Sequence, residues 1–194
     1  MVTTSVAMMK VMEERGIHAD VAAGLSLGEY CALVAAGVMT ADDAIRTVRE
    51  RGILMQEAVP AGVGGMSAVL GMTADEINAV VDEIPNVQVA NYNCPGQLVI
   101  AGEKAALAEA IENCKAAGAR RALPLAVSGA FHTPLMAKAA AELRAYVADF
   151  TFSAPKMDIY SNLDGKVYDC SDLPAHLEQP MLSPVRWTPL VKQG

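Results

Sequence analysis

The sequence has few of the features that mark secreted, metal-binding or membrane-spanning chains. Its four cysteines lie far apart and form no CxxC pair, which favours a reducing cytosol over a disulfide framework. No apolar run reaches the ~18 residues of a membrane span, and the N-terminus lacks the basic and apolar segments of a signal peptide. No group of Cys, His, Asp or Glu has metal-ligand spacing. We therefore expect a cytoplasmic protein with no membrane association and no metal.

Positive charge is also scarce. The 194 residues include 15 Lys and Arg against 22 Asp and Glu, a formal net charge of -7. This balance argues against a nucleic-acid groove and against a polybasic membrane face. Hydrophobic residues make up 53% of the chain and charged residues 19%, which excludes a disordered chain.

The order of the expected elements divides the chain into two parts. Residues 61–127 are predicted to follow the order β-α-β-β-α-β of a ferredoxin-like unit, with strands at 66–70, 87–92, 98–101 and 122–127 and helices at 73–83 and 104–117. Residues 1–60 and 128–194 form the other part of an α/β chain. Its expected elements are helices at 4–14, 29–36, 41–58 and 134–149, a buried parallel strand at 20–23, and a hairpin around Asp164-Gly165.

The stretch from Gly24 to Gly28 reads Gly-Leu-Ser-Leu-Gly and matches the G-x-S-x-G pattern of a nucleophile elbow. In such an elbow the serine lies on a cramped turn between a strand and a helix, so that its hydroxyl projects outward. The bare pattern also occurs by chance. Here an apolar strand is expected before it and a helix after it, and we therefore predict that Ser26 is a nucleophile.

A serine nucleophile needs a general base, and the chain has three histidines. His18 and His176 are expected at the surface or at an edge. His132 directly precedes a predicted helix that begins at Thr133 and Pro134. The positive end of that helix would keep the imidazole neutral, as a base requires. We predict His132 as the base; the alternative is a histidine that merely packs in a loop.

Arg51 stands on the inward side of the helix predicted at 41–58. It belongs to a stripe at helical spacing formed by Ala44, Val48, Arg51, Met55 and Ala58. An arginine buried there needs an anion, and its neighbours along the helix supply none. We predict that Arg51 binds a substrate carboxylate; the alternatives are a salt bridge to a distant acid or a side chain that reaches solvent.

Several segments resemble one known family, the malonyl-CoA:acyl carrier protein transacylases, which are related to the acyltransferase domains of polyketide synthases. The resemblance is collinear and extends over nearly the whole chain. It rests on Gly24–Tyr30, Arg51-Gly52 with Met55-Gln56, Asn91–Gln97, Gly129–Met136 and Ser183–Trp187.

The resemblance implies an α/β-hydrolase-like body with an inserted ferredoxin-like subdomain. It implies that Ser26 attacks malonyl-CoA while His132 takes the serine proton, and that the malonyl group then passes to the phosphopantetheine thiol of acyl carrier protein. By the same resemblance, Arg51 grips the malonyl carboxylate and the Leu27 N–H is an oxyanion donor. A backbone carbonyl holds the histidine, and no cofactor is needed beyond the two substrates.

Other polar residues are candidates for substrate contacts. Asn93 and Asn162 are expected either to line the cleft or to form turns. Gln179 is the residue nearest to a glutamine of the family, but it is displaced by one position and Pro180 intervenes. Leu25 stands where the family usually has histidine, so a polar contact beside the nucleophile is lost.

The comparison with the family also suggests that the body is incomplete at both ends. Family members begin with a strand and a Gly-Gln-Gly-type loop that supplies a second oxyanion donor, and they finish with a further strand and helix. This sequence starts after that first strand and loop, and it stops before the final strand and helix. Two alternatives to the transferase stay open: a serine esterase, which Gly24–Gly28 taken alone would also fit, and a non-catalytic fragment, which Leu25 and the missing ends would fit.

We expect a monomer that meets an acidic carrier protein through a local basic surface. The candidate residues are Arg120, Arg121, Lys138 and Arg144. The alternative is that these residues are scattered charges that only help solubility.

Overall fold

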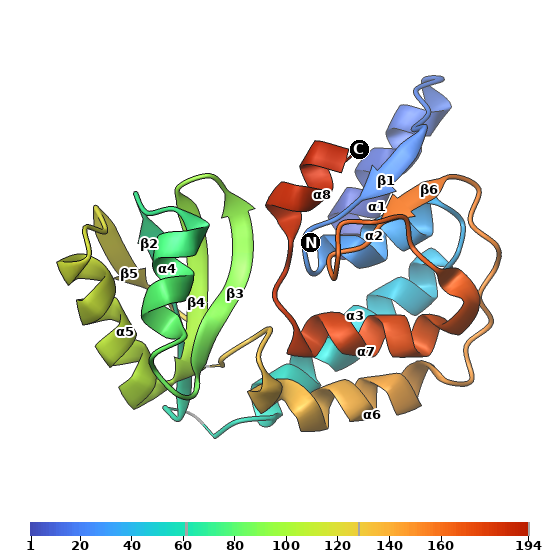
Figure 1. Cartoon of the computed structure of the whole chain (residues 1–194). Coiled ribbons are helices and arrows are strands. Elements are labelled where there is room, and N and C mark those ends of the chain that lie inside the picture. Colours follow the sequence, from blue (N-terminus) through green and yellow to red (C-terminus); the bar gives the residue numbers. More distant parts are fainter. Residues whose placement is uncertain (61, 128, 194) are drawn as a thin grey trace.

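The computed structural model describes residues 1–60, 62–127 and 129–193. Ala61 and Ser128, which stand at the two predicted boundaries between the parts of the chain, and Gly194 lie outside the described residues. Two sheets are present in different regions of the molecule, as Figure 1 shows. One has four strands and the other has two.

The four-stranded sheet is built from β2 (Gly64–Leu70), β3 (Val87–Cys94), β4 (Gln97–Glu103) and β5 (Arg121–Pro124). Its strand order is β3-β4-β2-β5, and every pairing is antiparallel. Helices α4 (Ala74–Val81) and α5 (Lys104–Ala116) connect the strands and pack on the sheet. The predicted order β-α-β-β-α-β is therefore present. The first strand begins two residues earlier than predicted, and the last ends at Pro124 instead of Val127.

Alternation along the strands gives this sheet two apolar faces. On one face Val69, Val89 and Ile100 pack with Ile77 of α4 and Leu107 of α5. On the opposite face small and medium side chains contact the segment that carries His132. This second group contains Met66, Ala90, Val99, Ala101 and Ala130. The sheet thus supports the His132 segment from one side.

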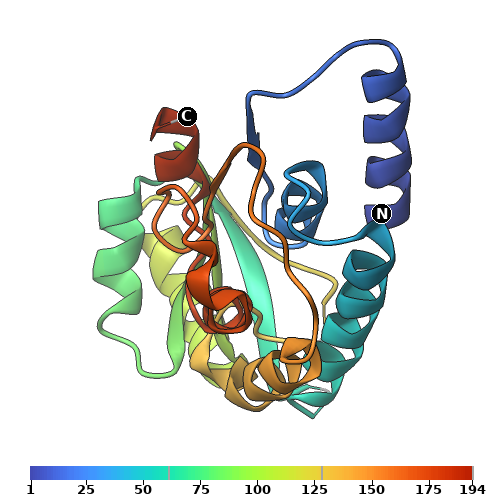
Figure 2. The same cartoon turned by 90° about the vertical axis from the view of Figure 1, so that its right-hand side faces the viewer.

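The rest of the described chain contains mostly helices. In chain order its elements are α1 (Val2–Glu14), β1 (Val21–Ala23), α2 (Gly28–Ala35), α3 (Ala41–Glu57), η1 (Pro134–Met136), α6 (Ala137–Val147), β6 (Asp158–Tyr160), η2 (Cys170–Asp172), α7 (Leu173–Leu182) and α8 (Trp187–Gln193). The helix predicted at 134–149 therefore begins as a 3-10 turn. Figure 2 shows α1 and α3 along one side of the molecule.

Two apolar clusters hold this part together. Leu33 of α2, Ile159 of β6 and Leu177 of α7 belong to one cluster. Met55 of α3 belongs to the other, which also contains Met136, Leu143 and Met181. Together these clusters place α3, α6 and α7 next to the elbow that follows β1.

Local signals fix several helix and turn positions. The Thr40 side chain accepts a hydrogen bond from the Asp43 N–H and caps α3. Thr73 and Glu76 form a capping box at the start of α4, in which each side chain bonds to the other residue's backbone. The predicted hairpin is confirmed, because Ser161 N donates to Lys166 O across the Asp164-Gly165 turn.

The strand predicted at 20–23 is parallel but not buried. Strand β1 pairs with β6, which is its one partner among the described strands. Val21 is 47% exposed, and Ala23 is exposed as well. The apolar run predicts the strand correctly, but β1 lacks the cover on both faces that makes a parallel strand a buried one. Across the described ranges, no helix has both the length and the apolar character needed to traverse a bilayer.

Candidate active site

The segment between β1 and α2 forms a sharp turn around Ser26. Ser26 has a φ of 49°, a left-handed conformation that costs a non-glycine residue roughly 1–2 kcal/mol. A side chain at Gly24 would overlap the backbone of Gly28, whereas a side chain at Gly28 would meet open space. The predicted crowding is therefore present at Gly24 and absent at Gly28.

Asn162 holds this turn from behind. Its Oδ1 accepts a hydrogen bond from Ser26 N at 2.7 Å, and its Nδ2 donates to Gly24 O at 2.6 Å. The residue is fully buried. The structure therefore places Asn162 behind the elbow and not along a cleft, and its two hydrogen bonds oppose the strain at Ser26.

His132 lies 106 residues beyond Ser26 in the sequence and next to it in space. Ser26 Oγ and His132 Nε2 are 3.0 Å apart, and His132 Nδ1 donates to the carbonyl of Pro180 at 2.6 Å. The bond to Pro180 assigns the proton of the neutral ring to Nδ1 and leaves the Nε2 lone pair facing the serine hydroxyl. His132 has a φ of 60°, and Gln88 Nε2 donates to its carbonyl at 3.1 Å.

Burial keeps the imidazole neutral. It lowers the pKa of His132 to about 4, and the positive charge of Arg51 acts in the same direction while the bond to Pro180 opposes it. The predicted cause was the positive end of the following helix. A 3-10 turn of three residues follows instead, so burial is the main cause.

Pro180 supplies the backbone carbonyl that the family resemblance implies, at a position that the sequence analysis did not identify. It lies in the last turn of α7, where carbonyl groups have no partner within the helix and the helix carries partial negative charge. That charge stabilises the imidazolium that forms when His132 takes a proton. Gln179, the predicted substrate contact next to it, is exposed to solvent. No side-chain signal marks a backbone carbonyl in advance.

Arg51 reaches the same serine from α3. It is 8% exposed, its Nη2 donates to Ser26 Oγ at 3.0 Å, and its guanidinium lies 5.9 Å from the centre of the Tyr30 ring. No carboxylate of the described residues forms a salt bridge with it. The predicted inward position is therefore confirmed, and the structure gives no support to a salt bridge with a distant acid.

Leu27 and Asn93 complete the set of predicted residues. Leu27 precedes the first turn of α2, and its N–H makes no hydrogen bond to the residues that the structure describes. Such an amide is available to a developing oxyanion. Asn93 lies on β3, and its side-chain oxygen is buried without a hydrogen-bond partner among the described residues.

Glu29 is a second residue that the sequence analysis missed. It follows the elbow in the first turn of α2, is 2% exposed, and accepts a hydrogen bond from Asn162 N at 3.5 Å. Burial raises its pKa to about 8. An acidic residue in the first turn of a helix is ordinary in sequence, so nothing distinguished Glu29 before its burial was known.

The four basic residues predicted to form one docking surface do not do so. Arg120 directly precedes β5 and Arg121 begins it, at the sheet edge opposite β3. Lys138 and Arg144 lie on α6. Arg144 is also paired with Glu178 at 3.0 Å and with Asp172 at 3.8 Å. The prediction of a single basic surface is therefore wrong.

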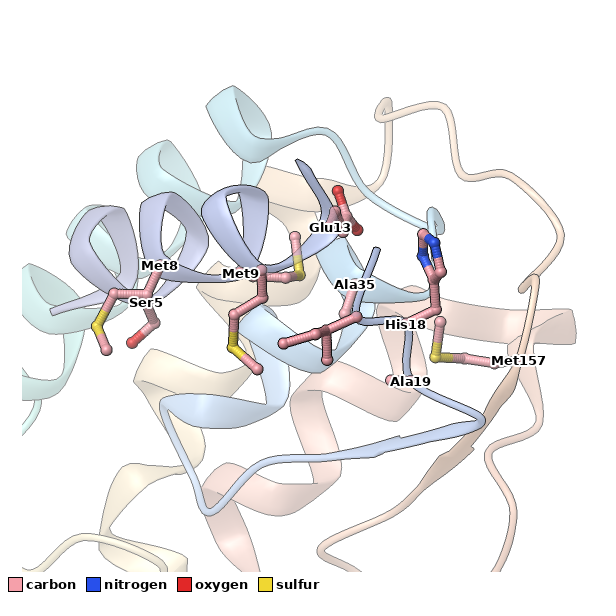
Figure 3. A pocket seen from close by; sticks show the side chains of 10 residues that line it. Ser5, Met8, Met9, Glu13, His18, Ala19, Ala35 and Met157 are labelled. Carbon is pink, nitrogen blue, oxygen red and sulfur yellow. The ribbon is translucent and has the colours of Figure 1, made fainter. Parts of the chain in front are cut away.

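A pocket of about 420 Å³ lies away from this site. Met8 and Met9 of α1, Ala35 of α2, and Met157 line part of it, as Figure 3 shows. The pocket includes none of Ser26, Arg51 and His132. Within the described ranges no group of three or more His, Cys, Asp or Glu residues could hold a metal ion.

Comparison with known proteins decides the family. The model of the acyl transferase domain matches residues 1–193. The chain belongs to the acyl transferase domain family. Among curated relatives, it is 44% identical over 192 residues to the malonyl CoA-acyl carrier protein transacylase of Bacillus subtilis, covering 96% of this chain and 61% of the relative. It is 45% identical over 197 residues to the enzyme of that name from Salmonella typhimurium, covering 99% and 64%.

Solved structures of this acyl transferase family give the same result. A crystal structure of an acyl carrier protein S-malonyltransferase from Vibrio cholerae has a TM-score of 0.94 and 43% identity, covering 99% of this chain and 64% of the other. A complex of a type II PKS acyl-carrier protein with its malonyl-transacylase has a TM-score of 0.95 and 43% identity, with the same coverage. The chain thus spans 61 to 64% of the length of these relatives.

Proposed function

We propose that this acyl transferase chain carries the centre that moves a malonyl group from malonyl-CoA to the phosphopantetheine thiol of acyl carrier protein. The observation that carries the proposal is the position of Arg51. Its guanidinium lies 3.0 Å from the Ser26 hydroxyl and forms a salt bridge with no carboxylate of the described residues. A buried, unpaired cation beside a nucleophile suits a substrate that brings its own carboxylate.

The first half of the reaction forms a malonyl ester on Ser26. His132 Nε2 takes the hydroxyl proton while Oγ attacks the thioester carbonyl. The Leu27 N–H stabilises the oxyanion, and the Pro180 carbonyl stabilises the imidazolium through Nδ1–H. The C–S bond then breaks, and CoA leaves as a thiol with the proton from His132.

The second half runs the same steps with another thiol. His132 takes the proton of the phosphopantetheine thiol, whose sulfur attacks the malonyl ester, and the proton then returns to Ser26 Oγ. In both halves Arg51 holds the carboxylate, which is separated from the reacting carbonyl by one methylene group. The distance between the guanidinium and Oγ allows one arginine to orient the substrate and to select for its charge.

The relatives support the substrates and the partner. The two curated relatives are named malonyl CoA-acyl carrier protein transacylase, and one solved relative is a complex with an acyl-carrier protein. Because this chain spans less than two thirds of their length, these properties are part of the proposal. It also includes a monomer in the cytoplasm, with no cofactor beyond the substrates and with substrate contacts from Asn93 and Gln179.

The same proposal extends to the finer description of the fold. Residues 1–60 and 128–194 would form an α/β-hydrolase-like body, and residues 61–127 a ferredoxin-like subdomain. The strand order β3-β4-β2-β5 with two helices supports the second assignment. The parallel pair β1 and β6, with the elbow directly after β1, supports the first.

A serine esterase has less support. That alternative expects an acidic side chain behind His132, but the acceptor at Nδ1 is the Pro180 carbonyl. A simple ester would also leave Arg51 without an anion. A non-catalytic fragment predicts that Ser26 does not react, which the following experiment tests.

The proposal is tested by incubating the purified chain with malonyl-CoA or acetyl-CoA and measuring the intact mass. We expect a malonyl adduct that Ser26→Ala abolishes. Arg51→Ala should lower the rate with malonyl-CoA relative to acetyl-CoA by roughly 10- to 100-fold, the value of a hydrogen bond to a charged group. Arg46→Ala, which removes a surface ion pair with Asp42 on the same helix, is the matched control. Equal losses with both thioesters would refute the role of Arg51.

A further inference from the structure

The buried carboxyl group of Glu29 lies behind the elbow and has no place in the mechanism above. Its Oε1 accepts a hydrogen bond from Asn162 N at 3.5 Å. The Asn162 side chain in turn bonds to Ser26 N and Gly24 O. A single chain of contacts therefore leads from Glu29 through Asn162 to the nucleophile.

The surroundings of Glu29 disfavour a negative charge. The side chain is 2% exposed, and within the described chain it forms no salt bridge. The buried Tyr168 hydroxyl lies next to Glu29 and acts against this effect, because as a donor to the carboxyl it lowers the pKa of Glu29, but by less than burial raises it. A protonated carboxyl in this position can donate as well as accept, which an ionised carboxylate cannot do.

The protonation state of Glu29 affects the positive charge that Arg51 offers to a substrate. Arg51 is the cation whose charge Glu29 experiences, and the same guanidinium contacts Ser26 Oγ. An ionised Glu29 would offset part of the positive charge of Arg51. It would also repel a carboxylate bound there.

We propose that Glu29 is a positioning residue that acts in its protonated form, in which it supports Asn162 and leaves the charge of Arg51 available for the substrate carboxylate. This inference rests on the proposed function for its substrate. It assigns to Glu29 two effects that can be separated, one on the geometry of the elbow and one on charge selection.

The ionisable groups around Glu29 make the charge effect measurable at alkaline pH. Burial raises the pKa of Glu29 to about 8 and that of Tyr30 to about 12. Burial also raises the pKa of Tyr168 well above its usual value, and that of Cys170 above 9.0. Burial lowers the pKa of His132 to about 4. Of these five groups, Glu29 is therefore the one whose pKa lies between pH 7 and pH 9.

The test is single-turnover acylation of Ser26 by malonyl-CoA or acetyl-CoA at pH 7 and pH 9, followed by intact mass. We expect the wild-type chain to need about tenfold more malonyl-CoA for half-maximal acylation at pH 9, the effect of a unit charge about 10 Å away at an effective dielectric constant of about 20. The requirement for acetyl-CoA should not change in this way. Glu29→Gln should remove the pH dependence, and Glu29→Ala should slow acylation by both thioesters.

Two results would overturn the inference. One is a Glu29→Gln chain in which the concentration for half-maximal acylation, taken for malonyl-CoA relative to acetyl-CoA, changes with pH as it does in the wild-type chain. The other is an infrared spectrum in which Glu29→Gln removes no protonated-carboxyl band at pH 7. The infrared measurement does not require acylation. If neither thioester acylates Ser26, the proposed function fails while the band still decides whether Glu29 is protonated. Glu109→Gln, which changes an exposed carboxyl on α5, is the control for both measurements.

Discussion

Glu29 should bind its proton more tightly in the folded chain than in the unfolded chain, and this difference can be measured as stability. Burial raises its pKa from 4.5 to about 8 on folding. Below pH 4.5 both the folded and the unfolded chain hold the proton, and the contribution of Glu29 to the free energy of unfolding is most favourable. As the pH rises towards 8, the unfolded chain loses the proton while the folded chain keeps it, so the free energy of unfolding falls.

The size of the effect follows from the two pKa values. A difference of about 3.5 pKa units corresponds to about 5 kcal/mol when both states are ionised. Between pH 5 and pH 7 the loss is about 2 to 3 kcal/mol. Glu29→Gln keeps the shape of the side chain and has no proton to lose. The stability of this variant relative to the wild type should therefore rise by about 2 to 3 kcal/mol over that interval.

The assay is urea unfolding at pH 5, 6 and 7, followed by circular dichroism and by the fluorescence of Trp187, the one tryptophan of the chain. Other ionisable groups affect both chains alike, so the difference between the two curves isolates Glu29. Glu109→Gln should show a difference that does not change with pH. A Glu29→Gln difference that is also constant from pH 5 to pH 7 would refute the argument that burial holds the proton on Glu29.

Three further predictions concern the elbow and one helix. Gly24→Ala should prevent Ser26 acylation, because the added methyl would overlap the Gly28 backbone; the intact mass measures this. Gly28→Ala meets open space and should raise the free energy of unfolding by about 0.5 to 1 kcal/mol, which urea unfolding measures. Asn162→Ala removes the partners of Ser26 N and Gly24 O and should cost about 2 to 4 kcal/mol of stability; an unchanged urea midpoint would contradict this. Thr73→Ala breaks the capping box of α4 and should cost about 1 kcal/mol in the same assay, with no effect on the rate of Ser26 acylation.

Local patterns predicted most elements of the fold because they depend on neighbours in sequence. The predicted helices at 41–58 and 73–83 begin at Thr40 and Thr73, whose side chains bond to residues three positions later, and Asp164-Gly165 marks the hairpin turn. The exposure of β1 could not be predicted in this way. An apolar run of three residues looks the same whether or not other segments cover it, and Val21 is exposed because little of the described chain packs over it.

The site was predictable where a side chain carries the chemistry. Ser26 was marked by its elbow pattern, Arg51 by its place on an apolar stripe, and His132 by the short supply of histidines. The contributions of Asn162 and Glu29 depend on contacts across more than 130 residues. No rule of sequence spacing extends over that distance, so the hydrogen bonds of Asn162 to the elbow and the burial of Glu29 could be recognised only in the three-dimensional structure.

The carbonyl of Pro180 has a consequence for how this centre can be dissected. Alanine scanning of α7 would leave the acceptor of His132 Nδ1 in place, because every residue at position 180 brings a carbonyl. Such a scan would therefore find a dyad of Ser26 and His132. An ester in place of the peptide bond between Pro180 and Met181 would weaken that carbonyl as an acceptor and expose the third member. The orientation of His132 thus depends on the path of the backbone at Pro180, which substitutions of single side chains leave in place.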